Sequence, residues 1–174
     1  MRKLCLVLLV ALAALSVALA QTPLDPTLEA RLKKVFPSAT AFSTKQTSPV
    51  SHFIAYTGSG AARTVAGYVY WTTDLEPLER GYDGPIKMLV GMDMKGILTG
   101  ILVADHKEPY GYFSVELPGF ARQFTKKNIR DPFKVGMDVN AVSRATITIT
   151  SSARAIRNSS LRVARALIAP PAAK

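Results

Sequence analysis

Two apolar segments joined by a short turn constrain the fold of this chain most strongly. Residues 86–94, IKMLVGMDM, and 97–105, ILTGILVAD, have the composition of strands, and the Lys-Gly pair at 95–96 predicts a hairpin turn between them. Both strands are too apolar to leave one face in water. We therefore expect the hairpin to lie centrally in a sheet that helices cover. Gly91 and Gly100 interrupt the two strands, which predicts a bulge or the close approach of another group.

The remaining elements fit an α+β fold, in which helices pack on a twisted, mostly antiparallel sheet. In chain order the patterns predict a helix over 26–35, strands between 39 and 70 with a turn at 58–60, a helix over 118–127, a strand over 139–148 and a helix over 152–168. We expect a signal peptide over 1–20, an N-terminal helix and hairpin part over 21–80, the core of the domain over 81–168 and a disordered tail over 169–174.

The N-terminal residues have the layout of a signal peptide. Two basic residues, Arg2 and Lys3, precede an apolar run over 4–14, and small residues at 18 and 20 suit signal peptidase. The pattern predicts a cleaved leader and an exported, for instance periplasmic, protein; an uncleaved anchor is the alternative, although the run is short for a membrane span. Cys5 lies in this leader, so the mature chain has no cysteine and no disulfide or thiolate chemistry.

The charge of the chain favours anionic ligands. Removal of residues 1–20 takes away two of the 22 basic residues and none of the 12 acidic ones, which leaves a net charge of +8. Such a balance attracts phosphates, lipid headgroups and acidic proteins. Nucleic acid is disfavoured as a partner because the basic residues are spread along the chain and the protein is expected to be exported.

The residues of common catalytic sites are sparse. The sequence has no metalloprotease, Walker, nucleophile-elbow or dinucleotide-binding motif. His52 and His106 are isolated, and a structural role is the better interpretation of each. A secreted hydrolase that uses Ser143 or Thr146 with His106 is an alternative that nothing else in the sequence supports.

The segment over 138–160 is rich in Ser and Thr. On the predicted strand, Thr146, Thr148 and Thr150 share a face with Arg144, and the following helix is expected to start near Ser151 or Ser152. Hydroxyls, an arginine and a helix N-terminus together predict a phosphate site. The alternative is ordinary structure, because Thr favours strands and Ser favours helix caps.

The same segment resembles a known family. NAVSRAT, residues 140–146, resembles the flavinylation motif of the FMN-binding domain family, Asp-x-x-Ser/Thr-Gly-Ala-Thr, in which the last Thr carries FMN through a phosphoester bond. The segment over 81–109 also resembles this family, which includes an exported domain of the nitrous-oxide reductase regulatory flavoprotein and subunits of the Rnf complex and the sodium-pumping NADH:quinone reductase. The similarity extends over roughly 81–166 and implies an FMN-binding core.

The resemblance implies which residues bind FMN. They are Thr146, as the covalent attachment site, with Asn140, Ser143, Arg144, Ala145, Tyr82, Gly84, Glu108 and Tyr110. Asn140 and Arg144 depart from the motif, since the family has Asp and Gly at these positions. Arg144 lacks the conformational freedom of glycine, but its charge suits a phosphodiester. The flat flavin ring requires apolar neighbours, for which the candidates are Leu89, Met92, Met94, Tyr110, Tyr112 and Phe113.

The resemblance also implies a function. It predicts an exported flavoprotein that carries FMN on Thr146 and shuttles electrons between redox proteins, rather than a stand-alone enzyme. A flavin transferase that uses magnesium would install the FMN, and docking on a membrane redox complex fits this role. The donor and acceptor are not specified by the sequence. The alternative is a binding module with a degenerate motif that holds FMN noncovalently, or another anionic ligand.

Overall fold

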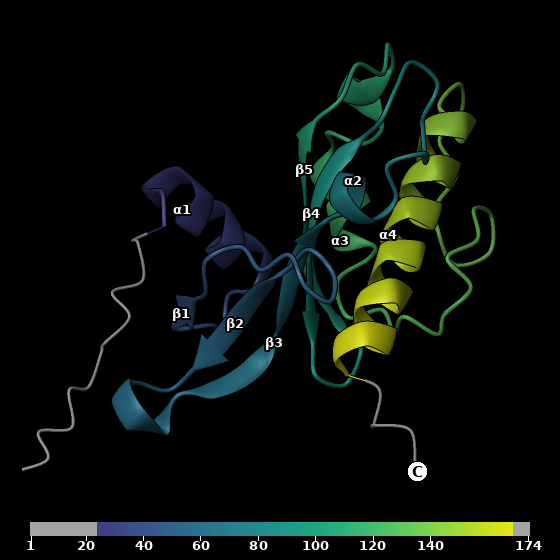
Figure 1. Ribbon diagram of the computed structural model, residues 1–174. Coiled ribbons are helices and arrows are strands. Elements are labelled where there is room, and N and C mark those ends of the chain that lie inside the picture. Colours follow the sequence, from purple (N-terminus) through teal and green to yellow (C-terminus); the bar gives the residue numbers. More distant parts are fainter. Residues whose placement is uncertain (1–23, 169–174) are drawn as a thin grey trace, which may run out of the picture.

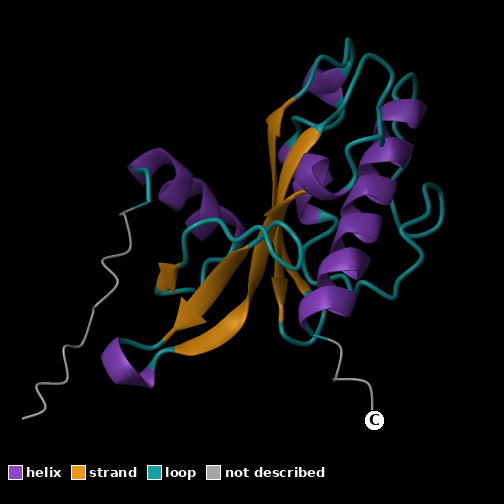
Figure 2. Cartoon of the chain, in the orientation of Figure 1, coloured by secondary structure: helices purple, strands orange, loops and turns teal. Residues whose placement is uncertain are grey.

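The computed structural model describes residues 24–168, so the expected leader and C-terminal tail lie outside the described residues. Its centre is one antiparallel sheet with the strand order β1-β2-β3-β4-β5 (Figure 1). The strands are β1 (Ala41–Phe42), β2 (Phe53–Thr57), β3 (Thr64–Trp71), β4 (Lys87–Asp93) and β5 (Leu98–Asp105). Helices lie on both sides of the sheet (Figure 2). The α+β fold class predicted from the sequence is confirmed.

Helix α1 (Pro26–Val35) covers one face of the sheet and has the bounds that the sequence predicts. The Asp25 carboxylate accepts a hydrogen bond from the Leu28 N–H at 2.9 Å, which caps the helix, and Pro26 occupies its first turn. Leu32 and Val35 are fully buried, and they belong to the same core cluster as Leu89. The apolar stripe of α1 therefore covers this side of the sheet.

The other face carries α2 (Thr72–Leu75), α3 (Pro118–Arg122) and the long α4 (Thr146–Leu167). This core contains Met88, Val90 and Met92 of β4 together with Ile149 and Ile156 of α4. Successive β4 residues thus point to opposite helical layers, as the period of a strand requires. β4 is apolar because helices cover both of its faces.

One expectation about the hairpin was wrong. Its strands and its turn at 95–96 form as predicted, but β5 is an edge strand and only β4 lies inside the sheet. β5 is apolar because helices cover both of its faces. Composition alone cannot distinguish such a covered edge strand from a central strand, because both bury two faces. In the described part of the chain no helix is long and apolar enough to cross a membrane.

The strand glycines allow α1 to approach the sheet closely. A Cβ atom on Gly91 would lie 2.5 Å from the Val35 carbonyl oxygen, and one on Gly100 would lie 2.8 Å from the same atom. The Thr99 hydroxyl donates to that oxygen at 2.6 Å. The predicted close approach is therefore confirmed, and the group that approaches is the C-terminal end of α1.

We expect Gly91→Ala to destabilise the protein by about 2 kcal/mol or more, because its Cβ would collide with the backbone of α1. The matched control is Gly119→Ala in α3, where a Cβ would meet no atom within 4 Å. Unfolding in urea, followed by circular dichroism, measures both changes. Equal midpoints for the two variants would contradict the close-approach explanation.

The sequence prediction was also wrong about 139–148. This segment forms no strand, and α4 starts at Thr146 rather than near Ser151 or Ser152. Thr and Ile favour strands as single residues, but Ile149, Ala153 and Ile156 also recur at helical spacing and are buried against the sheet. Tertiary packing of that stripe overrides the local preference. The helix α3 is shorter than the predicted 118–127 and ends at Arg122.

Most hydroxyls of α4 serve packing. The Ser152 hydroxyl donates to the Thr148 carbonyl oxygen at 2.7 Å, and the Ser160 hydroxyl donates to that of Ile156 at 2.6 Å. The buried Tyr70 hydroxyl in turn donates to Ser160 at 2.7 Å. These small side chains satisfy their polar atoms within the helix and let α4 lie close to the sheet.

Candidate functional site

A pocket of about 560 Å³ lies at the N-terminal end of α4. Three segments that are distant in sequence form it: the loop that contains Tyr82, the segment after β5, and the start of α4. Its lining residues are Tyr82, Pro109, Tyr110, Arg144, Ala145, Thr146, Ile147 and Thr148. The volume is within the range of small-molecule sites. Five residues predicted for the site, Tyr82, Tyr110, Arg144, Ala145 and Thr146, meet here.

The first turn of α4 presents backbone N–H groups to this pocket. Ala145 occupies the N-cap position without a capping side chain, and the first helical hydrogen bond runs from the Ile149 N–H to the Ala145 carbonyl oxygen at 2.9 Å. The N–H groups over 146–148 therefore have no partner within the helix. The first turn also contains no acidic residue. Such a helix start attracts an anion through its donors and its dipole.

Two threonines line the pocket, and their hydroxyls differ in availability. Thr148 is only 3% exposed, and its hydroxyl donates to the Glu108 carboxylate. Thr146 is exposed on the first turn. The hydroxyl of Thr146 is consequently the one that an external enzyme or ligand reaches.

Arg144 adopts a backbone conformation that favours glycine. Its φ is +66°, in the left-handed region that costs most side chains free energy. The resembling motif has glycine at this position, which is the residue that a left-handed conformation favours. The conformation also places an arginine among the residues that line the pocket, where it is exposed.

We expect Arg144→Gly to raise the free energy of unfolding by about 0.5 to 1 kcal/mol, because relief of the left-handed strain exceeds the entropy of the added glycine. The same change should weaken noncovalent binding of FMN, since it removes a cation from the pocket. Denaturant unfolding and flavin fluorescence titration measure the two effects. Arg31→Gly, at an exposed position of helix α1 outside the pocket, is a control for loss of a surface arginine, and it should lower stability. A variant at 144 that is both less stable and unchanged in FMN affinity would contradict this interpretation.

The buried Glu108 connects two of the segments that line the pocket. It is 6% exposed, and its carboxylate accepts hydrogen bonds from the N–H groups of Tyr82 and Asp83, each at 3.0 Å, and from the Thr148 hydroxyl. The residue does not line the pocket. Its position is therefore that of a clamp between the 81–84 loop and the first turn of α4, and contact of Glu108 with the cofactor stays a prediction.

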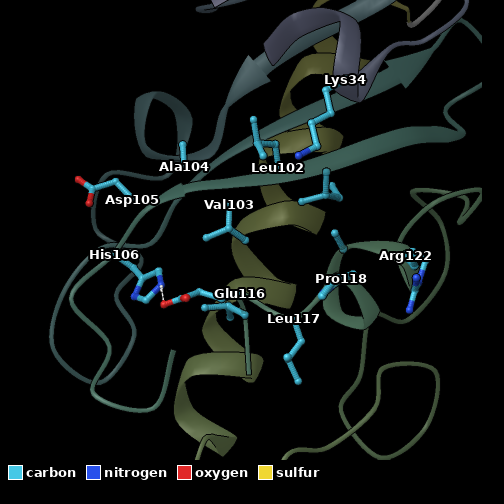
Figure 3. Close-up of a pocket in the computed structure, with 13 residues that line it drawn as sticks. Lys34, Leu102, Val103, Ala104, Asp105, His106, Glu116, Leu117, Pro118 and Arg122 are labelled. Carbon is cyan, nitrogen blue, oxygen red and sulfur yellow. Dashed lines mark ion pairs between the residues drawn. The ribbon is translucent and has the colours of Figure 1, made fainter. Parts of the chain in front are cut away.

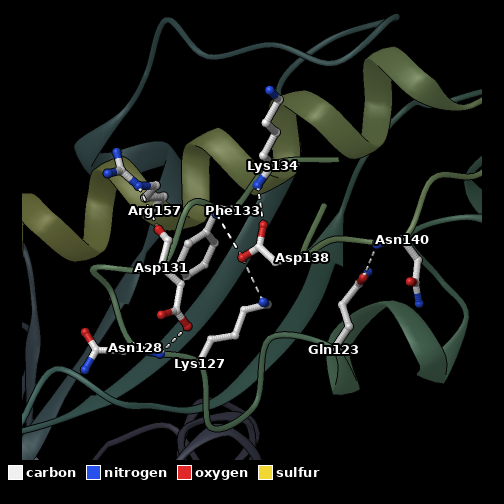
Figure 4. Close-up of polar contacts among 9 residues, drawn as sticks. All are labelled: Gln123, Lys127, Asn128, Asp131, Phe133, Lys134, Asp138, Asn140 and Arg157. Atoms are coloured by element: carbon white, nitrogen blue, oxygen red, sulfur yellow. Dashed lines mark hydrogen bonds and ion pairs between the residues drawn. The ribbon is translucent and has the colours of Figure 1, made fainter. Parts of the chain in front are cut away.

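The other predicted site residues lie around the pocket. Gly84 is buried with φ +148°, and its carbonyl oxygen accepts from the Gly81 N–H at 2.7 Å, which closes the loop that presents Tyr82. Ser143 is exposed beside the pocket without lining it. Asn140 is exposed, and its N–H donates to the Gln123 side-chain oxygen at 2.8 Å (Figure 4).

Asp138 organises the loop that leads to the site, and the sequence analysis missed it. Its carboxylate accepts from Lys127 at 2.9 Å and from the N–H groups of Phe133 and Lys134 at 3.1 and 2.6 Å (Figure 4). Burial, the largest single influence, raises the pKa of Asp138, but these hydrogen bonds together outweigh it and lower the pKa below its ordinary value. A single loop Asp followed by Val139 gave no signal of this role in the sequence.

This pKa shift predicts a pH-dependent contribution to stability. A depressed pKa in the folded state stabilises the protein above the unfolded pKa of about 3.9, and the contribution is lost as the pH falls through the folded value. We expect Asp138→Asn to lower the urea midpoint at pH 7 and to differ less from the unchanged protein at lower pH, below about 3.9. The matched control is Asp83→Asn, because Asp83 is exposed on a loop. Asp93 is unsuitable as a control because its carboxylate accepts hydrogen bonds in a turn. A gap that stays constant between pH 7 and pH 3 would contradict the ionic role.

Two residues predicted to contact the flavin ring lie in the core of the protein and do not line the pocket. Leu89 and Met92 are fully buried, and Leu89 belongs to the core on the opposite face of the sheet. Of the predicted ring contacts, Tyr110 does line the pocket; it is 41% exposed and packs against Phe113 at 5.3 Å between ring centroids. The second aromatic group of the lining is Tyr82, 70% exposed. Exposed aromatic faces at a pocket rim suit a flat aromatic ligand.

Fold and site together define a class of protein: an α+β domain that binds a ligand with both an anionic group and an aromatic ring. Comparison with protein families identifies that ligand. Residues 81–160 match the FMN-binding domain, so this part of the chain belongs to the FMN-binding domain family, with FMN as its cofactor. The matched segment includes the whole lining of the pocket. Comparison with curated proteins found no match.

Proposed function

We propose that this flavoprotein is exported, carries FMN esterified to Thr146 and passes electrons between redox proteins. The observation that supports covalent attachment best is the exposed Thr146 hydroxyl at the first helical position of α4, inside the pocket and beside free N–H groups. Phosphate bonded to this hydroxyl would lie at the positive end of the helix dipole. The exposed Arg144 would neutralise the negative charge that the phosphodiester keeps.

The attachment is a phosphoryl transfer with a flavin dinucleotide as donor. The Thr146 oxygen forms a bond to the phosphorus of the FMN moiety, and the bond between that phosphorus and the second phosphate breaks. The nucleotide leaves, and the hydroxyl proton is released. A flavin transferase with magnesium would supply the catalysis, since phosphoryl transfer depends on metal-assisted charge neutralisation.

Electron transfer depends on the bound FMN, which supplies the redox chemistry, while the protein positions and retains it. Retention by an ester does not depend on free flavin, which suits a protein outside the cytoplasm. Exposed Tyr82, Tyr110 and Ile147 at the pocket leave room for a redox protein to approach. Docking on a membrane redox complex belongs to the same proposal.

The arginines of α4 are weak candidates for a surface that binds an acidic partner. Arg154 pairs with Glu79 at 2.7 Å, and Arg162 pairs with Glu76 at 2.9 Å. Both hold the segment after α2 against α4. Their charges are partly neutralised within the protein, so an acidic partner gains less from them.

The alternative function is noncovalent binding of FMN, and Asn140 is the observation that favours it. This residue replaces the acidic residue of the motif and is exposed, so a transferase would meet an amide in place of a carboxylate. One experiment separates the two functions: the protein is produced by export together with a flavin transferase, then denatured and precipitated. Yellow colour in the pellet, with an added mass of about 438 Da for FMN less water, supports the ester. Yellow colour in the supernatant supports noncovalent binding.

A further inference from the structure

A second groove, of about 670 Å³, follows the outer edge of β5. One wall is β5 with the residue after it, over 101–106, and the other is the segment 115–122 that includes α3 (Figure 3). Lys34 of α1 reaches the same groove from above the sheet. The groove shares no lining residue with the FMN pocket. The groove is therefore a site distinct from the FMN pocket.

The strand along this groove has an unpaired edge. At its beginning, β5 is covered, because the Leu98 N–H donates to the Lys127 carbonyl oxygen at 2.9 Å and the Lys126 N–H donates to that of Leu98 at 2.8 Å. From Ile101 to Asp105 the described residues contain no backbone partner other than β4. About half of the backbone groups over these residues thus face outward, as on any edge strand.

The protection of this edge against strand pairing is limited to the register shift of β5 opposite Lys87 and Met88 and to the exposed Asp105 at its end. Natural edge strands carry inward charges or proline, whereas Leu102, Val103 and Ala104 are apolar and half-buried. Together with Leu117 and Pro118 they give the groove an apolar middle. The composition suits a paired strand better than one in water.

Charges occupy the two ends of the groove with opposite sign. Figure 3 shows Asp105 and Glu116 at one end and Lys34 and Arg122 at the other. Glu116 pairs with His106 at 3.1 Å, while Lys34, Arg122 and Asp105 take part in no ion pair among residues 24–168. A groove with this pattern is complementary to itself after rotation by half a turn.

We propose that a second copy of this chain binds here, with the two β5 strands antiparallel across a twofold axis near Val103. In this register Ile101 of one copy lies opposite Asp105 of the other. Within one strand, Ile101 and Asp105 are about 13 Å apart. Asp105 then meets the Lys34 and Arg122 end of the other copy, and both apolar middles are buried together. The two sheets continue into one, which satisfies the outward N–H and C=O groups.

Sedimentation equilibrium of the purified protein tests the proposal through a charge-swap series. We expect the unchanged protein to dimerise and Asp105→Lys to weaken dimerisation about tenfold or more, because it places like charges together. Lys34→Glu should weaken it likewise, and the double variant Asp105→Lys/Lys34→Glu should recover most of the loss. Both residues are exposed, so the substitutions should leave folding intact; thermal unfolding checks this.

The matched control is Lys95→Glu, which makes the same charge change at the exposed hairpin turn and should leave dimerisation unchanged. A monomer at concentrations up to about 1 mM would overturn the proposal. A dimer that responds equally to Lys95→Glu and Lys34→Glu would also overturn it, since the interface would then lie elsewhere. If the protein is a monomer and its groove binds a strand of a different protein, the dimer proposal is wrong and that interaction replaces it.

Discussion

Thr146→Val should abolish covalent flavin entirely while leaving the fold intact. Valine has nearly the shape of threonine but no hydroxyl, so no phosphoester can form. Thr146 is exposed at the start of α4, and a valine there removes no hydrogen bond from the core. In intact-mass spectra of protein produced with a flavin transferase, the added mass of about 438 Da should disappear.

The matched control is Thr150→Val, which makes the same change one turn later in α4, where the residue is half-buried and does not line the pocket. This variant should keep the added mass. Thr146→Ser is informative as a second variant, because it retains a hydroxyl and should keep at least part of the flavin. Covalent FMN on Thr146→Val would refute the attachment site, and peptide mapping would then locate the modified residue.

Glu108→Gln should lower the free energy of unfolding by about 2 to 4 kcal/mol. Three donors converge on this buried carboxylate: the N–H groups of Tyr82 and Asp83 and the Thr148 hydroxyl. An amide offers one oxygen in place of two, so its NH₂ group must face a donor. The loop over 81–84 and the first turn of α4 then lose their common anchor, and incorporation of FMN should fall with them.

The matched control is Glu116→Gln, since Glu116 is about half exposed and, among residues 24–168, forms an ion pair with His106 alone. It should change the unfolding midpoint little. Thr148→Val removes a single donor from the cluster and should cost about 1 kcal/mol, which remains measurable if Glu108→Gln fails to fold. Equal midpoints for Glu108→Gln and Glu116→Gln would contradict the clamp.

The sequence by itself determined the N-terminal helix, the β4–β5 hairpin and FMN as the cofactor. The helix at 26–35 follows from its apolar spacing, its capping Asp25 and its Pro26, and these are short-range features. The β4–β5 hairpin likewise follows from two apolar runs and a Lys-Gly turn. FMN followed from the resemblance of 81–109 and 140–146 to the FMN-binding domain family, which the family comparison supports.

Only the tertiary structure decided where α4 begins, which hydroxyl is accessible and what Glu108 does. Alternating Thr and Ile predicts a strand locally, and the sheet face that buries Ile149 and Ile156 makes it a helix instead. Thr148 and Glu108 are 40 residues apart, so no local pattern links them. Composition likewise cannot distinguish a central strand from an edge strand covered by helices, because both bury two faces. Contacts between distant segments fix these features, and such contacts exist only once the chain has folded.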